Sequence, residues 1–240
     1  MPHRWEALSD GWEIEVSDDF GFGADALHLA RFSVPRAGER AVDLGTGCGI
    51  LPLLWCRARP DLQVTALEIQ PAAAAMARRS AARCGVSDRM TVLDADLRRW
   101  RMAMPPESQT LAAMNPPYFL PGSGKVSESP AARIARHETA DPDRPGCTLA
   151  DAAHAAAGLL RRGGRFCLCH RPERLCDLLE TLRAAELEPK RLVWVCARRN
   201  AAPWLVLCEA VRGARPGLRI EAPYIETDAG QKENTAEFSL

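Results

Sequence analysis

The feature that most constrains the fold is a regular alternation of short apolar runs with helical segments. Residues 39–45, "ERAVDLG", form an apolar run that ends in glycine, and residues 49–59 after it have helical spacing. The pattern repeats with predicted strands at 62–69 and 90–96 and a predicted helix between them at 71–85. Strands that alternate with helices in this way are typical of a parallel sheet covered by helices.

The second half of the chain continues the pattern and then changes it. The further predicted elements are strands at 110–115, 165–170, 191–197 and 203–211, and helices at 24–34, 148–164 and 172–186. The last two strands are joined only by "RRNAA", a spacing that suits an antiparallel hairpin and excludes a parallel crossover. The predicted fold class is therefore α/β, with a Rossmann-like, doubly wound, mostly parallel seven-stranded sheet and an antiparallel C-terminal hairpin strand.

The chain of 240 residues is long enough for one large domain with a buried core. We expect an N-terminal extension with a helix at 1–37, the main domain at 38–212 and a C-terminal tail at 213–240. Residues 120–147 are rich in Pro, Gly and Ser and form a long insertion. Long loops in compact domains are often functional.

The composition excludes several classes of protein. Lys plus Arg and Asp plus Glu each number 31, so a generally basic nucleic-acid coat is not expected. The nine cysteines, the lack of a signal peptide and the lack of a membrane-spanning apolar run indicate a cytoplasmic protein with reduced thiols and no membrane partner. Cys167, Cys169 and His170 have no second ligand pair at finger spacing, so "RFCLCH" is interpreted as a core strand and no metal is predicted.

Acidic residues end three successive predicted strands. Asp43 ends the first, Glu68 the second and Asp96 the third, with Asp94 as the alternative in the third. Each alone is more often a solvated residue. Because ligands of open α/β sheets bind outside the carboxyl ends of the strands, the three together indicate a ligand site.

The glycine turn after the first strand discriminates between cofactors. "DLGTGCG" has three glycines at alternate positions, but Ile50 stands where a dinucleotide fingerprint needs glycine or alanine. The turn instead suits a nucleoside without phosphate, such as S-adenosylmethionine, whose methionine part the glycine backbone can approach closely. Glu68 is placed to accept both ribose hydroxyl hydrogens, and Asp96 to accept from the adenine amino group.

The stretch "NPPY" at the end of the fourth strand has the groups that a weak, ring-conjugated amine needs. The Asn115 side-chain oxygen and the Pro116 carbonyl can accept the two amine hydrogens, which turns the nitrogen lone pair toward a methyl donor. Pro117 removes a competing amide hydrogen, and Tyr118 offers a face for stacking. Positioning is then the main catalytic contribution.

These motifs together resemble a known family. "DLGTGCG" followed by "NPPY" resembles class I S-adenosylmethionine-dependent methyltransferases that act on a planar amide or an exocyclic amine. "GFGADALHLARF" and "NPPYFLPGSGKVSESPAARIARHE" resemble the bacterial tRNA1(Val) (adenine-37 N6) methyltransferases more specifically. The resemblance implies that residues 38–212 form a class I methyltransferase domain, which converts S-adenosylmethionine to S-adenosylhomocysteine while it methylates N6 of the adenine beside the anticodon of a tRNA.

The resemblance also assigns site residues. The target-base site comprises Asn115, Pro116, Pro117 and Tyr118. The cofactor site comprises Asp25, Asp43, Gly45, Thr46, Gly47, Gly49, Glu68, Ile69 and Asp96. Asp25 falls on the N-terminal helix that covers the cofactor in this family, but a role as the cap of that helix explains it equally well.

RNA contacts are expected in the loop after Tyr118, since phosphates attract clustered basic residues. The predicted contacts are Lys125, Arg133, Arg136 and His137. The last three share one face of a predicted helix in "ARIARHE". The basic stretches at 98–101 and 198–199 are further candidates, although charge runs are usually solvated surface.

Other functions remain open at this point. A protein glutamine N5-methyltransferase, or a methyltransferase of an exocyclic amine in ribosomal RNA or DNA, needs the same "NPPY" step. A non-catalytic nucleoside-binding domain has no use for amine activation and is the least favoured. No obligate protein partner is inferred.

Overall fold

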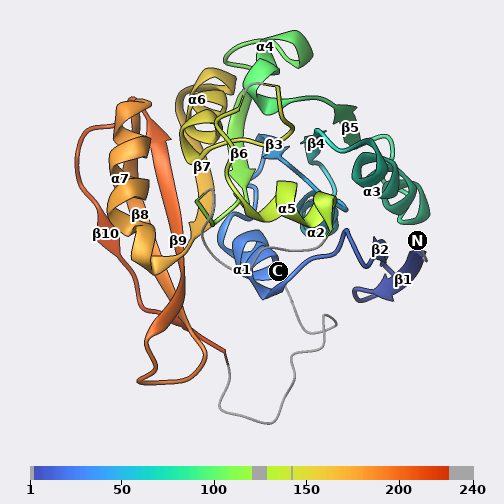
Figure 1. The fold of residues 1–240 in the computed structure, drawn as a ribbon, viewed down its shortest axis with the longest axis horizontal. Helices are drawn as coiled ribbons and strands as arrows, with labels where there is room; N and C mark the ends of the chain where they lie inside the picture. The colour runs from blue at the N-terminus through green and yellow to red at the C-terminus, as the bar shows by residue number, and fades with distance from the viewer. Residues whose placement is uncertain (1–2, 121–128, 142, 227–240) are drawn as a thin grey trace.

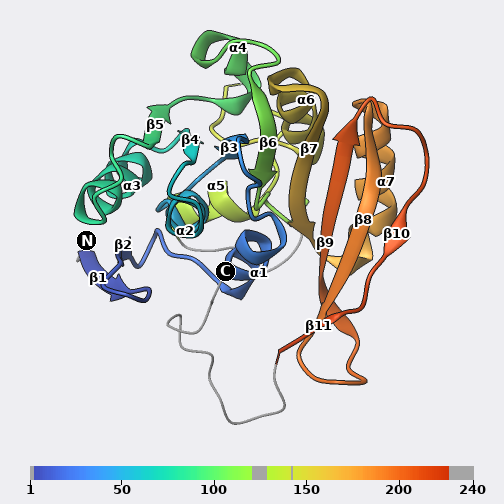
Figure 2. The ribbon, with the colours of Figure 1, turned by 180° about the vertical axis from the view of Figure 1, so that it is seen from behind.

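The computed structural model describes residues 3–120, 129–141 and 143–226 (Figure 1). A central sheet separates two hydrophobic clusters, which gives three layers, and the view from behind shows the same arrangement (Figure 2). One cluster lies between the sheet and helices α1, α2 and α3, and the other between the sheet and α4, α6 and α7.

The helices are α1 (Ala24–Phe32), α2 (Ile50–Ala58), α3 (Pro71–Arg83), α4 (Trp100–Ala103), α5 (Pro130–Arg136), α6 (Leu149–Leu159) and α7 (Leu175–Ala184), with short 3-10 turns η1 (Leu97–Arg99) and η2 (Pro172–Arg174). The strands are β1 (His3–Ala7), β2 (Glu13–Ser17), β3 (Arg40–Leu44), β4 (Gln63–Glu68), β5 (Met90–Asp94), β6 (Gln109–Met114), β7 (Leu160–His170), β8 (Leu187–Cys196), β9 (Pro203–Arg212), β10 (Arg219–Ile220) and β11 (Tyr224–Ile225).

The main sheet has the order β10-β8-β9-β7-β6-β3-β4-β5, and β11 also pairs with β8. Strands β3 to β7 are parallel to one another, whereas β9 lies between β7 and β8 and is antiparallel to both. The predicted mostly parallel sheet with an antiparallel hairpin strand is therefore confirmed. Among the residues that the structure describes, the sheet has nine strands rather than seven, because β10 and β11, of two residues each, add to it from the segment predicted as a tail.

A hairpin of β1 and β2 was not expected from the sequence. It lies beside α3, where the Glu15 amide donates to the Ser80 hydroxyl at 2.9 Å and Arg79 pairs with the Glu15 carboxylate at 2.6 Å. Both strands are only five residues long, and each has only two apolar residues, Trp5 and Ala7 in β1 and Ile14 and Val16 in β2, so their alternation does not stand out. The hairpin is stabilised by its contacts with α3 more than by its own composition.

The predicted helix 148–164 is wrong in its second part. Helix α6 ends at Leu159, and residues 160–164 belong to β7. Gln109 of β6 pairs with Leu160 while Leu111 pairs with Arg165, so the residues between form a bulge in β7. The glycine pair at 163–164 suggested that the helix continues up to it and stops there. Pairing with β6 and burial of Leu160 instead make residues 160–164 part of a strand.

Packing between α6 and α4 predicts a clear effect for Gly158→Ala. A Cβ at Gly158 would lie 2.0 Å from Cζ2 of Trp100, whose side chain is buried. Alanine normally favours a helix by up to about 1 kcal/mol over glycine, but overpacking a core costs about 1–3 kcal/mol or more. We therefore expect a net loss of unfolding free energy in denaturant titrations. In a Trp100→Phe background, which lacks Cζ2, the same substitution should cost less, and an equal cost would contradict this explanation.

No helix in the described parts of the chain is both long and apolar enough to cross a membrane.

Candidate active site

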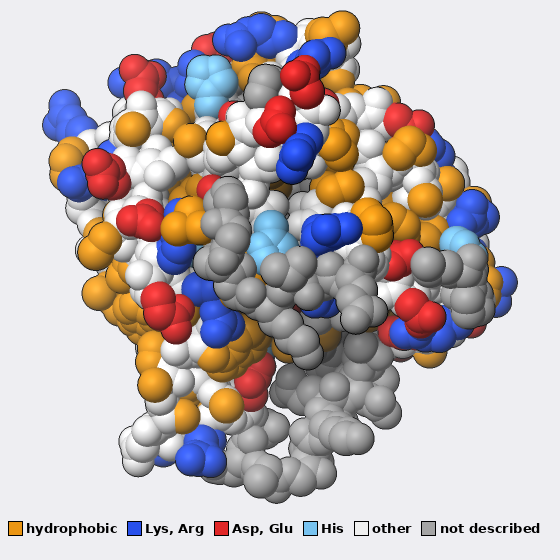
Figure 3. Space-filling view, viewed as in Figure 1, with side chains coloured by type: hydrophobic (Ala, Val, Ile, Leu, Met, Phe, Trp, Pro, Cys, Tyr) orange, Lys and Arg blue, Asp and Glu red, His pale blue; other side chains and the backbone are white. Residues whose placement is uncertain are grey.

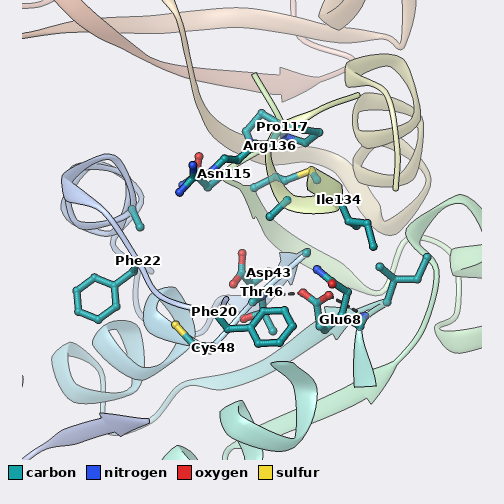
Figure 4. A pocket seen from close by; sticks show the side chains of 18 of the residues that line it. Phe20, Phe22, Asp43, Thr46, Cys48, Glu68, Asn115, Pro117, Ile134 and Arg136 are labelled. Carbon is teal, nitrogen blue, oxygen red and sulfur yellow. Dashed lines mark hydrogen bonds between the residues drawn. The ribbon is translucent and has the colours of Figure 1, made fainter. Parts of the chain in front are cut away.

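A cavity of about 500 Å³ lies at the carboxyl edge of β3, β4 and β6 (Figure 4). Its walls are the segment before α1 with the start of α1, the glycine turn, the ends of β4 and β6, and α5. The predicted residues that line it are Asp25, Asp43, Gly45, Thr46, Gly47, Glu68, Ile69, Asp96, Asn115, Pro116, Pro117, Tyr118 and Arg136. The structure thus brings the predicted cofactor residues and the predicted target-base residues to one cavity.

All three glycines of the turn have a left-handed backbone conformation. Gly47 has φ 57°, and a Cβ added there would meet no atom within 4 Å, so this part of the turn is open toward the cavity. Gly49, with φ 93°, lies outside the cavity lining, and a Cβ there would lie 3.0 Å from the Ala77 Cβ and 3.1 Å from Met90. Gly49 therefore serves the close packing of α2 against α3, whereas Gly47 leaves room for a ligand.

Glu68 fixes the shape of the turn. Its buried carboxylate accepts hydrogen bonds from the Gly47 amide at 2.7 Å and the Gln70 amide at 2.8 Å. Burial raises the pKa of Glu68, and these backbone donors oppose the rise. A carboxylate held by two amides has further lone pairs for a ligand's hydroxyl groups.

Asp43 lies next to Glu68 on the neighbouring strand and is fully enclosed. Burial, with the Glu68 charge adding to it, raises the pKa of Asp43 to about 7. A perturbed carboxyl group in a cavity is typical of functional sites.

Asp96 is placed differently from the expectation. Strand β5 ends at Asp94, and the Asp96 side chain caps η1 through the Arg98 amide at 2.9 Å. The Arg98 guanidinium also bonds the Asp96 carboxylate, at 2.7 Å for the shortest contact, and this outweighs burial and lowers the pKa of Asp96. Asp96 still lines the cavity, so a ligand's amino group has to share its oxygens with Arg98. The alternative, Asp94, is exposed outside the cavity lining and pairs with Arg78 at 3.0 Å.

The Asn115 to Tyr118 step is anchored by a residue from α1. Asp25 is not the N-cap of that helix, because the N-cap is Gly23, although Asp25 Oδ1 accepts from the Ala26 amide in the first turn. Instead one Asp25 oxygen, Oδ2, accepts from the Asn115 amide nitrogen at 3.1 Å and from the Tyr118 hydroxyl at 2.9 Å. The Tyr118 hydroxyl also contacts the Asn115 oxygen Oδ1. Asp25 thus connects the N-terminal helix to the predicted target-base site.

Cys169 is a site residue that the sequence did not reveal. Its thiol donates to Asn115 Oδ1 at 3.1 Å and lies 3.1 Å from the Tyr118 hydroxyl. Burial raises the pKa of Cys169 well above its usual range, so the group is a thiol that can donate. The expected core strand at "RFCLCH" is present in β7, but which of its cysteines faces Asn115 depends on the pairing of Met114 with Leu168.

Phe20 and Phe22 are also cavity residues that carried no distinct sequence signal. In Figure 4 the Phe20 ring lies close to Thr46 and Cys48 of the glycine turn, and Phe22 lies beside α1. Asp19, beside Phe20, accepts a hydrogen bond of 2.5 Å from the Ser129 hydroxyl at the start of α5. The segment before α1 and helix α5 therefore meet across the cavity.

The predicted RNA-contacting residues are only partly together. Helix α5 ends at Arg136, which lines the cavity near Asn115 and Pro117, while Arg133 is exposed outside the lining (Figure 4). His137 does not share the helix face with them, because it is the extended C-cap, forms a β-bridge with Phe119 and packs against the Phe119 ring at 5.5 Å. Lys125 lies outside the described residues.

The other basic stretches do not line the cavity. In the stretch 98–101, Arg98 pairs with Asp96 and Trp100 is buried, whereas Arg99 and Arg101 are exposed. Arg198 and Arg199 are exposed in the turn between β8 and β9. On the face of the molecule seen in Figure 3, basic and acidic side chains are interspersed, in line with the neutral net charge. Within the described residues no group of three His, Cys, Asp or Glu side chains is arranged to hold a metal ion.

The known proteins to which this chain is similar are methyltransferases. A family model described as a precorrin methyltransferase domain matches residues 24–108, which include the glycine turn and the acidic strand ends but stop before Asn115. A tRNA1(Val) (adenine(37)-N6)-methyltransferase of Porphyromonas gingivalis is 30% identical over 209 residues, covering 86% of this chain and 78% of the relative. A relative of the same name from Glaesserella parasuis is 33% identical over 95 residues, which cover 40% of this chain and 39% of the relative.

The extent of the matches varies. Five curated relatives, all of that name, are covered over only 39% to 56% of their length, so the chain spans about half of these proteins. Among solved structures, a predicted O-methyltransferase of Agrobacterium tumefaciens, Atu636, has a TM-score of 0.67 at 23% identity, with 87% of this chain and 90% of that chain covered. This likeness shows the methyltransferase fold. Since the Porphyromonas relative matches at 30% identity across more than two thirds of both chains, this protein belongs to the tRNA1(Val) (adenine(37)-N6)-methyltransferase family.

Proposed function

We propose that this protein is an S-adenosylmethionine-dependent N-methyltransferase that modifies the N6 amine of an adenine in the anticodon loop of a tRNA. The observation that carries the proposal is the single cavity in which the glycine turn and Glu68 lie opposite the Asn115 step (Figure 4). Family membership supports the choice of substrate. A tRNA substrate also implies a cytoplasmic location.

The residues on the cofactor side fit S-adenosylmethionine. The open backbone at Gly47 leaves room for the methionine part, and Glu68 has lone pairs left for a ribose diol. Ile69 and Leu97 are apolar neighbours in the lining for a flat adenine, with Asp96 beside them. When bound, the cofactor supplies the methyl group on a cationic sulfur.

On the opposite side, Asn115 and Pro116 hold the amine. Asn115 Oδ1 and the Pro116 carbonyl accept its two hydrogens, so that the nitrogen lone pair points toward the methyl group. The Tyr118 ring is fixed by its hydroxyl contacts and by His170, which packs edge-on at 5.5 Å, and it offers the stacking surface for the base. Fixed acceptors and a fixed ring position the amine without a strong base.

Arg136 is the basic residue best placed for a phosphate next to the target base. It lines the cavity from the last turn of α5, and Arg133 lies exposed on the same short helix. A base turned out of an anticodon loop costs little unstacking energy, because the loop is unpaired.

Glu68→Ala should weaken cofactor binding more than it slows transfer. The substitution removes the proposed ribose acceptor and also the acceptor of the part-buried Gly47 and Gln70 amides, which then lack that partner. We expect the Kd for S-adenosylmethionine to rise about 30- to 300-fold, as for loss of buried hydrogen bonds to a charged group. Isothermal titration calorimetry measures this, with Glu173→Ala at an exposed position of η2 as the control. An unchanged Kd would remove Glu68 from the ribose site.

The substrate is tested by incubation with labelled S-adenosylmethionine and unmodified total tRNA, followed by digestion to nucleosides. Label in N6-methyladenosine is the expected result. Label only in added protein would favour glutamine-amide methylation, label only in ribosomal RNA or DNA would favour those amines, and cofactor binding without any transfer would favour a binding domain.

A further inference from the structure

The Asp25 carboxylate forms a junction between the N-terminal helix and the Asn115 step. Its Oδ2 atom receives both the Asn115 amide nitrogen at 3.1 Å and the Tyr118 hydroxyl at 2.9 Å, while its Oδ1 atom accepts from the Ala26 amide at 2.9 Å. The Ala26 bond fixes the orientation of the carboxylate, and the bond from Asn115 fixes which way the Asn115 amide faces. With its nitrogen at Asp25, Asn115 directs Oδ1 away from Asp25.

The hydroxyl of Tyr118 has one proton and two acceptors within reach. One is Asp25 Oδ2 and the other is Asn115 Oδ1, the oxygen that the target amine needs. A hydrogen bond to a carboxylate is roughly twice as strong as one to a neutral amide oxygen. The Asp25 carboxylate therefore competes strongly for this proton, and while the proton points to Asp25, Asn115 Oδ1 has no donor from Tyr118.

The other donor at Asn115 Oδ1 is the Cys169 thiol, at 3.1 Å. A thiol is a weak donor, and this one is kept protonated by burial on β7. An amine hydrogen can replace or join it at an oxygen that has two lone pairs. Cys169 thus satisfies the buried oxygen without binding it strongly.

From this arrangement we propose that Asp25 is a positioning residue for methyl transfer. It holds the Asn115 amide in its acceptor orientation and withdraws the Tyr118 hydroxyl proton from Asn115 Oδ1, so that this oxygen is available to the target amine. The inference rests on the proposed function, since it concerns the same amine. It replaces the role as a cofactor ligand or helix cap that the sequence suggested for Asp25.

Kinetics of Asp25→Ala distinguish this role from cofactor binding. Without the carboxylate, Tyr118 donates to Asn115 Oδ1 and competes with the amine, so kcat should fall about 10- to 100-fold, as for misplaced reacting groups. The KM for S-adenosylmethionine should stay within about threefold, because Asp25 then contributes little to cofactor binding. Asp18→Ala, in the same segment and exposed, is the control with unchanged kinetics. A raised KM with unchanged kcat would overturn the proposal.

The double variant Asp25→Ala/Tyr118→Phe tests the competition itself. It keeps the ring but removes the competing hydroxyl, so its kcat should exceed that of Asp25→Ala severalfold, although Tyr118→Phe alone should lower the activity or leave it unchanged. If the losses in kcat of the two single variants simply added in the double variant, the proposal would be contradicted, because Tyr118→Phe rescues no activity if Asp25 is merely structural. If Asp25→Ala does not fold, Asp25→Asn carries the same test, since an amide has only one acceptor oxygen.

An NMR measurement separates this inference from the proposed function. The chain has two tyrosines, so tyrosine labelled with carbon-13 at Cζ gives two resonances, and Tyr118→Phe assigns that of Tyr118. Its shift should change in Asp25→Ala and stay unchanged in Asp18→Ala, and an unchanged shift in Asp25→Ala would refute the hydrogen bond. This readout needs no RNA. If the wild type transfers no methyl group to tRNA, the proposed function fails while the Tyr118 resonance still decides the contact.

Discussion

Asn115→Ala is expected to lower the rate of methyl transfer about 10²- to 10³-fold, the usual effect of removing one preorganised group that stabilises the transition state. The substitution takes away the oxygen proposed to accept an amine hydrogen, which is also the oxygen that the Tyr118 hydroxyl and the Cys169 thiol both contact, while the Tyr118 bond to Asp25 remains. The glycine turn and Glu68 are untouched, so the affinity for S-adenosylmethionine should change less than about threefold. Single-turnover transfer and calorimetric cofactor binding measure the two effects separately.

A matched control removes an amide elsewhere. Asn200→Gly lies in the turn between β8 and β9, where φ of 68° suits glycine, and it should leave both transfer and cofactor binding as in the wild type. The proposed role of Asn115 would be wrong if Asn115→Ala lost cofactor binding, or if it transferred methyl groups at the wild-type rate.

The largest expected effect on stability is that of Arg165→Met. The Arg165 side chain is 5% exposed, and its guanidinium pairs with Glu39 at 2.7 Å and Glu209 at 3.3 Å and donates to the Val34 carbonyl at 2.7 Å. Removing one partner of such a pair leaves buried carboxylates uncompensated, which costs about 3–5 kcal/mol of unfolding free energy. Chemical denaturation measures the loss. Arg183→Ala, at an exposed pair with Glu188, is the control and should leave the unfolding midpoint almost unchanged.

The pH dependence of that loss follows from Glu39. Burial raises the pKa of Glu39, but the bonds from Arg165 and the Arg36 amide outweigh it, so the pKa lies below the ordinary 4.5. The stability that Glu39 contributes is therefore present above pH 4.5 and is lost as the pH falls through the lowered pKa. In Arg165→Met the largest cause that lowers the Glu39 pKa is gone. The difference in unfolding free energy between this variant and the wild type should therefore narrow at acidic pH. A difference in unfolding free energy that stayed constant or widened below pH 4.5 would contradict the role given to Glu39.

Much of the fold could be predicted because local pattern and tertiary packing agree in the centre of the sheet. The apolar runs that became β3, β4 and β6 are buried on both faces, and the predicted residues Asp43, Glu68 and Asn115 lie at or next to the carboxyl ends of these strands. At the start of β7 the local sequence pattern and the tertiary packing disagree. A glycine pair suggested that a helix stops there, but pairing with β6 determines the backbone, and a local pattern does not contain that pairing.

The candidate site shows the same limit. Asn115 and Glu68 could be identified because each stands at a strand end in a recognisable motif. Cys169 could not, because its place beside Asn115 depends on the register of β6 against β7. The contacts of Asp25 with Asn115 and Tyr118 depend on how α1 lies across the sheet edge, whereas the sequence suggested a cofactor residue or a helix cap.

The central claim is methyl transfer to the N6 amine of one anticodon-loop adenine, and a pair of tRNA transcripts tests it most directly. One carries adenine next to the anticodon, and the other differs only by guanine at that position. Mass spectrometry of nuclease fragments after reaction with S-adenosylmethionine should show one added methyl group, on that adenine, in the first transcript and none in the second. Equal methylation of both transcripts, or of neither, would contradict the account.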